Sequence, residues 1–250
     1  QSFLKDYPGA RSDPERKFIR AVYSVISQTN QNWELVIVSD GCSITEKLYN
    51  DYFREYDNIL FEKVTEHAAQ NMQQKDDEVE FRIPGSPRGR AVEMATGDWI
   101  CYLDADDVYT RDAVDNIINF LKNLNNSGAD KRFLINKSRI ENFSWVIDEK
   151  SNMYEAGEPF RVPGLDSLWK TVSLINNNIS SSCSMLIHKA GYPEHKWGDG
   201  GDYKVPRDTL FIRRIINDKE QIKHGMFIDI PYYIRCHTKP KDVTNDGWDY

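Results

Sequence analysis

The stretch of sequence that decides the fold is Gly97-Asp98-Trp99-Ile100-Cys101-Tyr102-Leu103-Asp104-Ala105-Asp106-Asp107. Residues 99–103 form a short apolar run that is typical of a buried strand, and three carboxylates follow it. Strand alternation predicts that Asp104 and Asp106 point the same way, with the small Ala105 between them. Carboxylates this close repel one another unless a cation shares them, and hard oxygen ligands suit Mg²⁺ or Mn²⁺. The stretch therefore predicts a metal site able to hold a diphosphate, although an acidic turn ahead of a helix gives the same pattern.

The residues before this stretch extend it into a longer composite pattern. Arg88, Ala91-Val92 and Ala95 lead into Gly97, and the apolar run then ends in the acidic residues. This order of an Arg-bearing helix, a strand and an Asp-x-Asp (DxD) motif resembles the central signature of glycosyltransferase family 2. The resemblance covers most of residues 13–238. It implies a GT-A-like, Rossmann-like α/β fold with a mostly parallel central sheet flanked by helices.

Alternating helix and strand patterns on both sides of the stretch predict the same α/β class. Apolar residues at helical spacing predict helices over residues 13–28, 44–56 and 113–124. Apolar runs predict strands over residues 33–38, 59–64, 133–135 and 145–147. Such alternation favours a largely parallel sheet sandwiched between helices. By resemblance to the family, a strand is also expected within 179–188, a helix from 208, and an aromatic strand over 230–237.

Two segments divide the predicted domain. Asn125-Asn126-Ser127-Gly128 ends the helix after the DxD stretch, and we place a boundary there. Residues 1–128 would form the donor-binding half of one GT-A domain, and 129–250 its acceptor-binding half, with a smaller mixed sheet. The polar segment 65–87 is too long for an ordinary connection, so we expect it to be a mobile lid near the donor. Residues 148–178 are expected to be rich in loops.

Composition limits the class of protein. The chain has 250 residues and a net charge of −7, without a dense basic stripe, which argues against nucleic acid as a partner. No apolar run is long enough to span a bilayer, and no signal peptide opens the sequence. The four cysteines are far apart and lack metal-site spacing. We therefore expect a cytoplasmic enzyme, and its oligomeric state is left open.

The family resemblance implies roles for residues of the donor half. Asp40 follows an apolar strand, as does the aspartate that binds the nucleotide base in the family. Arg88 is a candidate contact of the diphosphate, because arginine can bind phosphate oxygens with two parallel bonds. Asp104 is expected to contact the ribose or donor sugar, and Asp106 to bind Mn²⁺ or Mg²⁺. The implied donor is a nucleoside-diphosphate sugar, UDP- or GDP-linked, and the acceptor is a hydroxyl group of a saccharide or other molecule.

The second half supplies the remaining candidates. The family inverts configuration, so a carboxylate must take the proton of the acceptor hydroxyl. Asp208 matches the aspartate of the family's Glu-Asp motif and is the expected base, with Asp202 in a glycine-rich loop as the alternative. His237 ends the aromatic strand in the family's Arg-x-His pattern, where it could complete the metal shell. A helix cap at Asp208 and a solvated histidine at 237 are the purely structural interpretations.

Several departures from the family pattern keep other functions open. Ser39 and Gly89 replace residues that the family commonly has, Arg207 stands at the glutamate, and no apolar strand precedes the first helix. A catalytically inactive nucleotide- or carbohydrate-binding module is therefore one alternative. Another is a haloacid-dehalogenase-type phosphatase with Asp104 as nucleophile. That class requires its first motif to open the domain, whereas αβ units precede Asp104 here.

Overall fold

The computed structural model describes Leu4 and residues 14–64, 87–136, 138–142, 169–173, 182–191, 215, 218–230 and 232–236. Its helices are α1 (Pro14–Ile26), α2 (Ser43–Tyr52), α3 (Pro87–Met94) and α4 (Ala113–Asn126), with short 3-10 helices η2 (Ser182–Ser184), η3 (Lys189–Gly191) and η4 (Ile222–His224). Its strands are β1 (Leu35–Asp40), β2 (Ile59–Val64), β3 (Trp99–Cys101), β4 (Val108–Tyr109), β5 (Phe133–Asn136), β6 (Ser138–Asn142), β7 (Trp169–Ser173), β8 (Met185–His188), β9 (Gly225–Ile228) and β10 (Tyr233–Cys236).

The predicted α/β class is confirmed by the order of these elements. Helix α1 begins at Pro14, where a proline costs no hydrogen bond, and buries an apolar face that includes Phe18 and Val22. Strands β1 and β2 then pair in parallel, from Leu35 opposite Ile59 onward, as the helix between them requires. The alternation read from the sequence therefore gives the first half of the fold.

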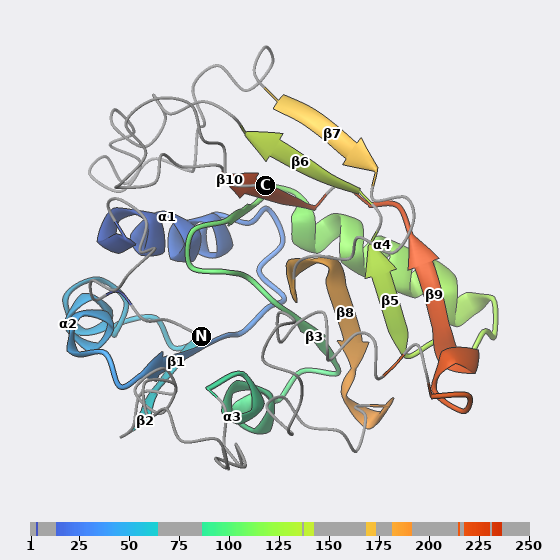
Figure 1. Cartoon of the computed structure of the whole chain (residues 1–250), viewed down its shortest axis with the longest axis horizontal. Coiled ribbons are helices and arrows are strands. Elements are labelled where there is room, and N and C mark those ends of the chain that lie inside the picture. Colours follow the sequence, from blue (N-terminus) through green and yellow to red (C-terminus); the bar gives the residue numbers. More distant parts are fainter. Residues whose placement is uncertain are drawn as a thin grey trace, which may run out of the picture.

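The described strands form three sheets (Figure 1). Strands β1 and β2 form one of them, β3-β8-β5-β9 the second and β4-β10-β6-β7 the third. Parallel pairing joins β1 to β2, β5 to β9 and β6 to β10, whereas β8 runs antiparallel to both β3 and β5. The sheets are thus more mixed than a mostly parallel arrangement, because β8 returns along β3 after a long excursion of the chain.

The second sheet is buried on both faces. Along β5, Phe133 and Ile135 pack in a cluster with Val92 of α3, while Leu134 packs in a cluster with Leu121 of α4. Successive residues of a strand point to opposite faces, so this alternation makes three layers of helix, sheet and helix. Figure 1 shows α4 running behind β8, β5 and β9. The DxD stretch leaves this sandwiched sheet at the end of β3.

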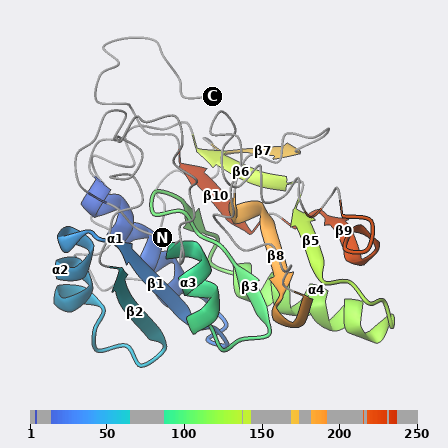
Figure 2. The ribbon, with the colours of Figure 1, turned by 60° about the horizontal axis from the view of Figure 1, so that its bottom comes forward.

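A cavity of about 580 Å³ separates β1 from β3. Its wall includes Leu35 and Val36 of β1, Ala91 of α3 and Cys101 of β3. Both strands are terminal in their sheets, and no strand of the described residues lies between them. In Figure 2, α3 lies in front of the space between the two strands. Sequence analysis found no apolar strand ahead of α1, and Leu4 alone of residues 1–13 belongs to the described part.

Some elements differ from the sequence-based expectations. Strands β4, β6 and β9 were not predicted, and β7 lies in the segment expected to be loop-rich. Within 179–188, the strand β8 occupies only the second half and η2 precedes it. The predicted strand 145–147 and residues 65–86 of the predicted lid lie outside the described residues, and Pro87 is the first residue of α3. The boundary at residue 128 stays a prediction.

Among the residues that the structure describes, no helix combines the length and the apolar character that a bilayer-spanning segment needs.

Candidate functional site

The DxD residues lie in a turn rather than in a strand. Strand β3 ends at Cys101, and the backbone N–H of Asp107 donates to the carbonyl oxygen of Asp104 at 3.1 Å. The expectation that Asp104 and Asp106 continue a strand is therefore wrong, because both lie in a turn, where strand alternation does not apply. Asp107 is only 5% exposed, whereas Asp104 and Asp106 are half-buried. We call residues 104–107 the acidic turn.

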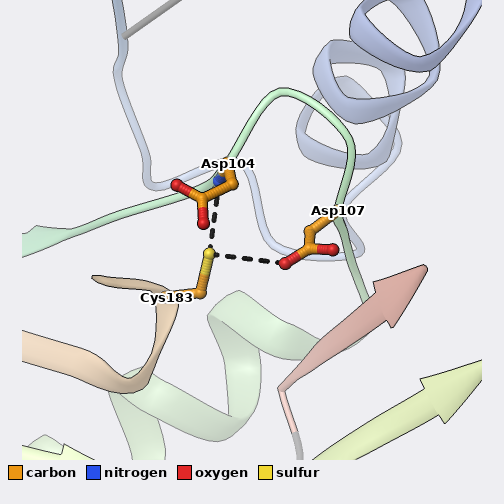
Figure 3. A group of neighbouring side chains, drawn as sticks. All are labelled: Asp104, Asp107 and Cys183. Carbon is orange, nitrogen blue, oxygen red and sulfur yellow. Dashed lines mark hydrogen bonds between the residues drawn. The ribbon is translucent and has the colours of Figure 1, made fainter. Parts of the chain in front are cut away.

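A cysteine from the second half lies against this turn (Figure 3). The Sγ atom of Cys183 accepts the backbone N–H of Asp104 at 3.2 Å, and it lies 3.8 Å from Oδ2 of Asp107, to which its S–H donates. Cys183 is fully buried in η2. Sequence analysis found no role for it, since the four cysteines are far apart in the chain. Cys183 reaches the acidic turn because β8 pairs with β3.

Arg88 approaches the acidic turn from α3. Its Nη2 atom lies 3.2 Å from Oδ1 of Asp104, and both side chains are partly exposed, at 24% and 34%. The structure thus brings together Arg88 and Asp104, which the sequence named separately as candidate donor contacts. By contrast, Arg90 forms a two-bond pair with Glu62 of β2, at 2.8 Å for each bond. Those hydrogen bonds lower the pKa of Glu62 and commit Arg90 to joining α3 to β2.

Buried polar residues of α1 and its C-terminal extension bind the backbone around the turn. Arg20, Ser24 and Gln28 are spaced by four residues, which places them along one line of the helix surface, and each is at most 4% exposed. We call these three residues the α1 polar stripe. Its bonds run from Arg20 Nη2 to Asp106 O (2.8 Å), Tyr109 N to Ser24 Oγ (3.1 Å), Gln28 Nε2 to Thr110 O (2.7 Å) and Val114 N to Gln28 Oε1 (3.0 Å).

The α1 polar stripe extends a signal that the sequence only half revealed. Ser24, Gln28 and Thr29 form a Ser-x-x-x-Gln-Thr pattern ahead of β1, which is also similar to glycosyltransferase family 2, but that pattern does not show what they bind. Arg20 has no signal of its own, because an arginine in a helix is usually solvated. Its position four residues before Ser24 is the feature that could have identified it.

Of the other residues predicted from the sequence, the structure describes Asp40. Asp40 closes β1 and is 1% exposed. Ala105 of the acidic turn packs against the cluster that contains Ile37 and Cys42, so the turn lies beside the end of β1 that carries Asp40. Asp202, Asp208 and His237 lie outside the described residues. Their roles therefore stay predictions, as do those of Asp40, Arg88, Asp104 and Asp106.

The acidic turn has a donor set that fits a divalent cation. One ligand atom each of Asp104, Asp107 and Cys183 lie within 4.8 Å of one another. Carboxylate oxygens are the ligands that Mg²⁺ and Mn²⁺ prefer, while a thiol is a softer donor. The sulfur is already engaged by an N–H and a carboxylate, so the oxygens of the turn are the better ligands. Asp106, the predicted ligand, is not in this group.

The part of the chain that contains this site matches the sequence model of a known protein family. Residues 82–173, which include α3, β3 and the acidic turn, match the sequence model of the family described as glycosyl transferase family 2. The resemblance found in the sequence is thereby confirmed.

Two curated proteins are similar in sequence. The amylovoran biosynthesis glycosyltransferase AmsB of Erwinia amylovora is 28% identical over 109 residues, which cover 43% of this chain and 32% of AmsB. An uncharacterized glycosyltransferase of Methanocaldococcus jannaschii is 24% identical over 152 residues, covering 59% of this chain and 43% of the relative. The chain thus aligns with less than half the length of either relative.

Solved structures share the fold. The structure of S. aureus TarS residues 1–349 in complex with UDP-GlcNAc superposes with a TM-score of 0.56 at 15% identity, covering 91% of this chain and 57% of that one. The UDP complex of the same protein gives 0.54, also at 15% identity, over 90% and 57% of the two chains. At this identity the likeness concerns the fold alone, and it confirms the GT-A-like architecture.

Proposed function

We propose that this chain, which carries a glycosyl transferase family 2 region over residues 82–173, transfers a sugar from a nucleoside-diphosphate sugar to an acceptor hydroxyl. The observation that carries the proposal is the acidic turn with Arg88 at its side, because the family match covers both. The transfer would invert the anomeric carbon, as the family does. We take UDP-GlcNAc as the first donor to test, since TarS has been crystallised with it, and GDP-sugars as the second.

The residues of the turn suit the charge of such a donor. The guanidinium of Arg88 lies at the edge of the turn and remains 24% exposed, so it can exchange Asp104 for a phosphate group of the donor. A bound Mn²⁺ or Mg²⁺ would neutralise the charge that develops on the departing diphosphate. The chain's own contribution is to hold the carboxylates in place and to keep Asp107 away from water. Asp104 is then available to the ribose or the sugar, and Asp106 to the metal.

Residues outside the described part complete the proposed mechanism. Asp208 would take the proton of the acceptor hydroxyl, with Asp202 as the alternative base, and His237 would add a metal ligand. Asp40, at the end of β1, would recognise the nucleotide base. The acceptor, the cytoplasmic location and the absence of nucleic acid among the partners stay predictions that a donor assay does not address.

A donor screen tests the proposal directly. The full chain is mixed with UDP-GlcNAc, other UDP-sugars, GDP-sugars and CDP-sugars, each with Mn²⁺ and with EDTA, and unfolding temperature and nucleotide release are measured. A ligand of the folded state raises the unfolding temperature. We expect one nucleotide class to stabilise the chain only with Mn²⁺ and its nucleotide to be released as the sugar passes, with inverted configuration, to water or to an added saccharide with free hydroxyl groups. Stabilisation without release to water or to any added saccharide would favour the inactive binding module, and phosphate release from an added phosphomonoester would favour the phosphatase.

A further inference from the structure

Cys183 occupies a position that the pairing of β3 with β8 determines. These strands are antiparallel, with Trp99 opposite His188 and Cys101 opposite Leu186. Continuing the register by three residues beyond Cys101 brings residue 104 opposite residue 183. The sulfur therefore meets the acidic turn at the residue where the turn begins. On its other side, the carbonyl oxygen of Cys183 accepts the hydroxyl of the buried Tyr232, which fixes its backbone.

The thiol joins the two ends of the same turn. It accepts the N–H of Asp104 and donates to the carboxylate of Asp107, while the backbone bond from Asp107 to Asp104 closes the turn between them. Asp107 and Cys183 are 5% and 0% exposed, so water does not replace these bonds if the sulfur is lost. Ala105 and Asp106 lie between the two fixed ends. The two ends of the turn are thus joined by Cys183, while Arg20 binds the carbonyl oxygen of Asp106 between them.

These contacts argue that the sulfur shapes the turn and does not bind the cation. The N–H of Asp104 points at the sulfur. A metal ion bound to the sulfur would face the partly positive hydrogen of this N–H, and the two would repel. The carboxylate of Asp107 is likewise directed at the thiol, from which it accepts a hydrogen bond. A metal on the sulfur would break both bonds, while a metal on the outer oxygens of the turn would leave them intact.

We propose that Cys183 is a positioning residue, which holds the acidic turn in the shape that presents Asp104 and Asp106 to a divalent cation and the diphosphate. The identity of the ligand in this inference rests on the proposed function. The hydrogen bonds of Cys183 to the turn do not depend on it. Loss of the thiol would remove this donor from the carboxylate of Asp107 and this acceptor from the N–H of Asp104. The turn would then sample other conformations. Binding of the cation and the nucleotide would be weaker, because it would have to order the turn at the cost of conformational entropy.

Three substitutions separate hydrogen bonding from packing. Cys183→Ala removes the bonds and some volume, Cys183→Val removes the bonds but keeps an apolar side chain, and Cys183→Ser keeps a donor and an acceptor. Cys101→Ala is the matched control. This control removes the thiol of Cys101, which lies in the neighbouring β3. Burial raises the pKa of that thiol to about 12, and the described structure gives it no hydrogen bond.

Two measurements are made on each variant. Amide hydrogen exchange at Asp104 and Asp107 reports the turn itself, and calorimetric titrations of UDP and GDP with and without Mn²⁺ report its use. For Ala and Val at position 183 we expect faster exchange at both amides and a loss of roughly 5- to 30-fold in Mn²⁺-dependent nucleotide affinity. Serine should restore slow exchange and most of the affinity. Affinity without Mn²⁺ should stay as in the wild type, which a general loss of stability would not produce.

The outcomes distinguish this inference from the proposed function. If the wild type binds neither nucleotide, the proposed function fails, while the exchange data still test the turn. If exchange and affinity of Cys183→Ala and Cys183→Val match those of Cys101→Ala, the positioning role is wrong. Co²⁺ binding supplies a further check, because a thiolate ligand gives Co²⁺ an intense near-ultraviolet band. Such a band in the wild type that disappears in Cys183→Ser would overturn positioning in favour of direct ligation.

Discussion

The two sides of the segment 99–114 differ in how they are held. On the side toward α1, the α1 polar stripe and Cys183 bind backbone groups between Asp104 and Val114. On the side toward β1, the segment borders a cavity of about 580 Å³, and no strand of the described residues pairs there with β3. The difference teaches that the acidic turn owes its shape to buried hydrogen bonds from distant residues. The neighbouring strand β1 contributes the cluster against which Ala105 packs, and it does not pair with β3.

The largest effect is expected on the side held by the α1 polar stripe. Gln28→Ala leaves the N–H of Val114 without this partner and removes a hydrogen bond to the carbonyl oxygen of Thr110, which keeps the N–H of Ala113. Gln28 is only 3% exposed. An unsatisfied buried group costs about 1–3 kcal/mol and a lost hydrogen bond about 1 kcal/mol, so the free energy of unfolding should fall by about 2–4 kcal/mol. Urea denaturation measures it. The exposed Gln31→Ala is the control and should stay within about 0.5 kcal/mol. Equal costs for the two glutamines would remove the distinction between the sides.

A matched pair of valines tests the other side. Val38 is fully buried in β1, whereas Val36 is partly buried and lines the cavity. Val38→Ala should lower the free energy of unfolding by about 2 kcal/mol, and Val36→Ala by less than about 1 kcal/mol, because only Val38 is packed on all sides. The same substitution on the same strand makes the comparison direct in urea. Equal losses would show that Val36 is packed as tightly as Val38, so that the cavity is filled in solution.

Tyr109 lies where the two sides meet, since it borders the cavity and donates to the carbonyl oxygen of Tyr102 at 3.0 Å. Burial raises its pKa well above 10, so the folded state keeps the phenol neutral when the unfolded chain ionises it. Its contribution to stability is present below pH 10 and is lost as the pH rises from there toward the folded-state pKa. Tyr109→Phe should cost about 1 kcal/mol at pH 7.

The control and the readout for Tyr109 are simple. Unfolding in urea from pH 7 to 11 should show a shallower alkaline loss of stability in Tyr109→Phe than in the wild type. Tyr52→Phe changes a phenol that is 44% exposed and should leave the profile as it is. Identical profiles for Tyr109→Phe and the wild type would mean that water reaches Tyr109 through the cavity.

Local patterns were enough to predict the helices and the first strands. In α4, Ile117, Leu121 and Leu124 recur at helical spacing, and all three are buried. The apolar runs of β1, β2 and β5 likewise name their strands. Strand β9 was missed because it has no alternation of polar and apolar residues. Its Met226 and Phe227 are both apolar, yet they are exposed, at 39% and 58%. A strand of two residues, such as β4, carries no periodicity at all.

The acidic turn could be located from sequence, but its supports could not. Asp104 and Arg88 were named because their spacing matches a composite motif. Cys183 reaches the turn across a separation of 79 residues and Arg20 reaches Asp106 across 86, through the pairing of β3 with β8 and the packing of α1. Contacts of this range depend on tertiary structure, and no local pattern encodes them. The predicted strand geometry at Asp104 and Asp106 was wrong for the same reason, since β3 ends at Cys101 in its pairing with β8.

One titration tests most directly whether the acidic turn binds a nucleotide through a divalent cation. Wild type, Asp106→Asn and Asp112→Asn are titrated with UDP and GDP in the presence and absence of Mn²⁺. Asp112→Asn makes the same charge change at the exposed start of α4, beyond the turn. We predict that Asp106→Asn keeps its fold but loses the Mn²⁺-dependent part of the affinity, by at least the roughly 10–100-fold that changes around a metal site cost. Unchanged Mn²⁺-dependent affinity in Asp106→Asn would contradict the account.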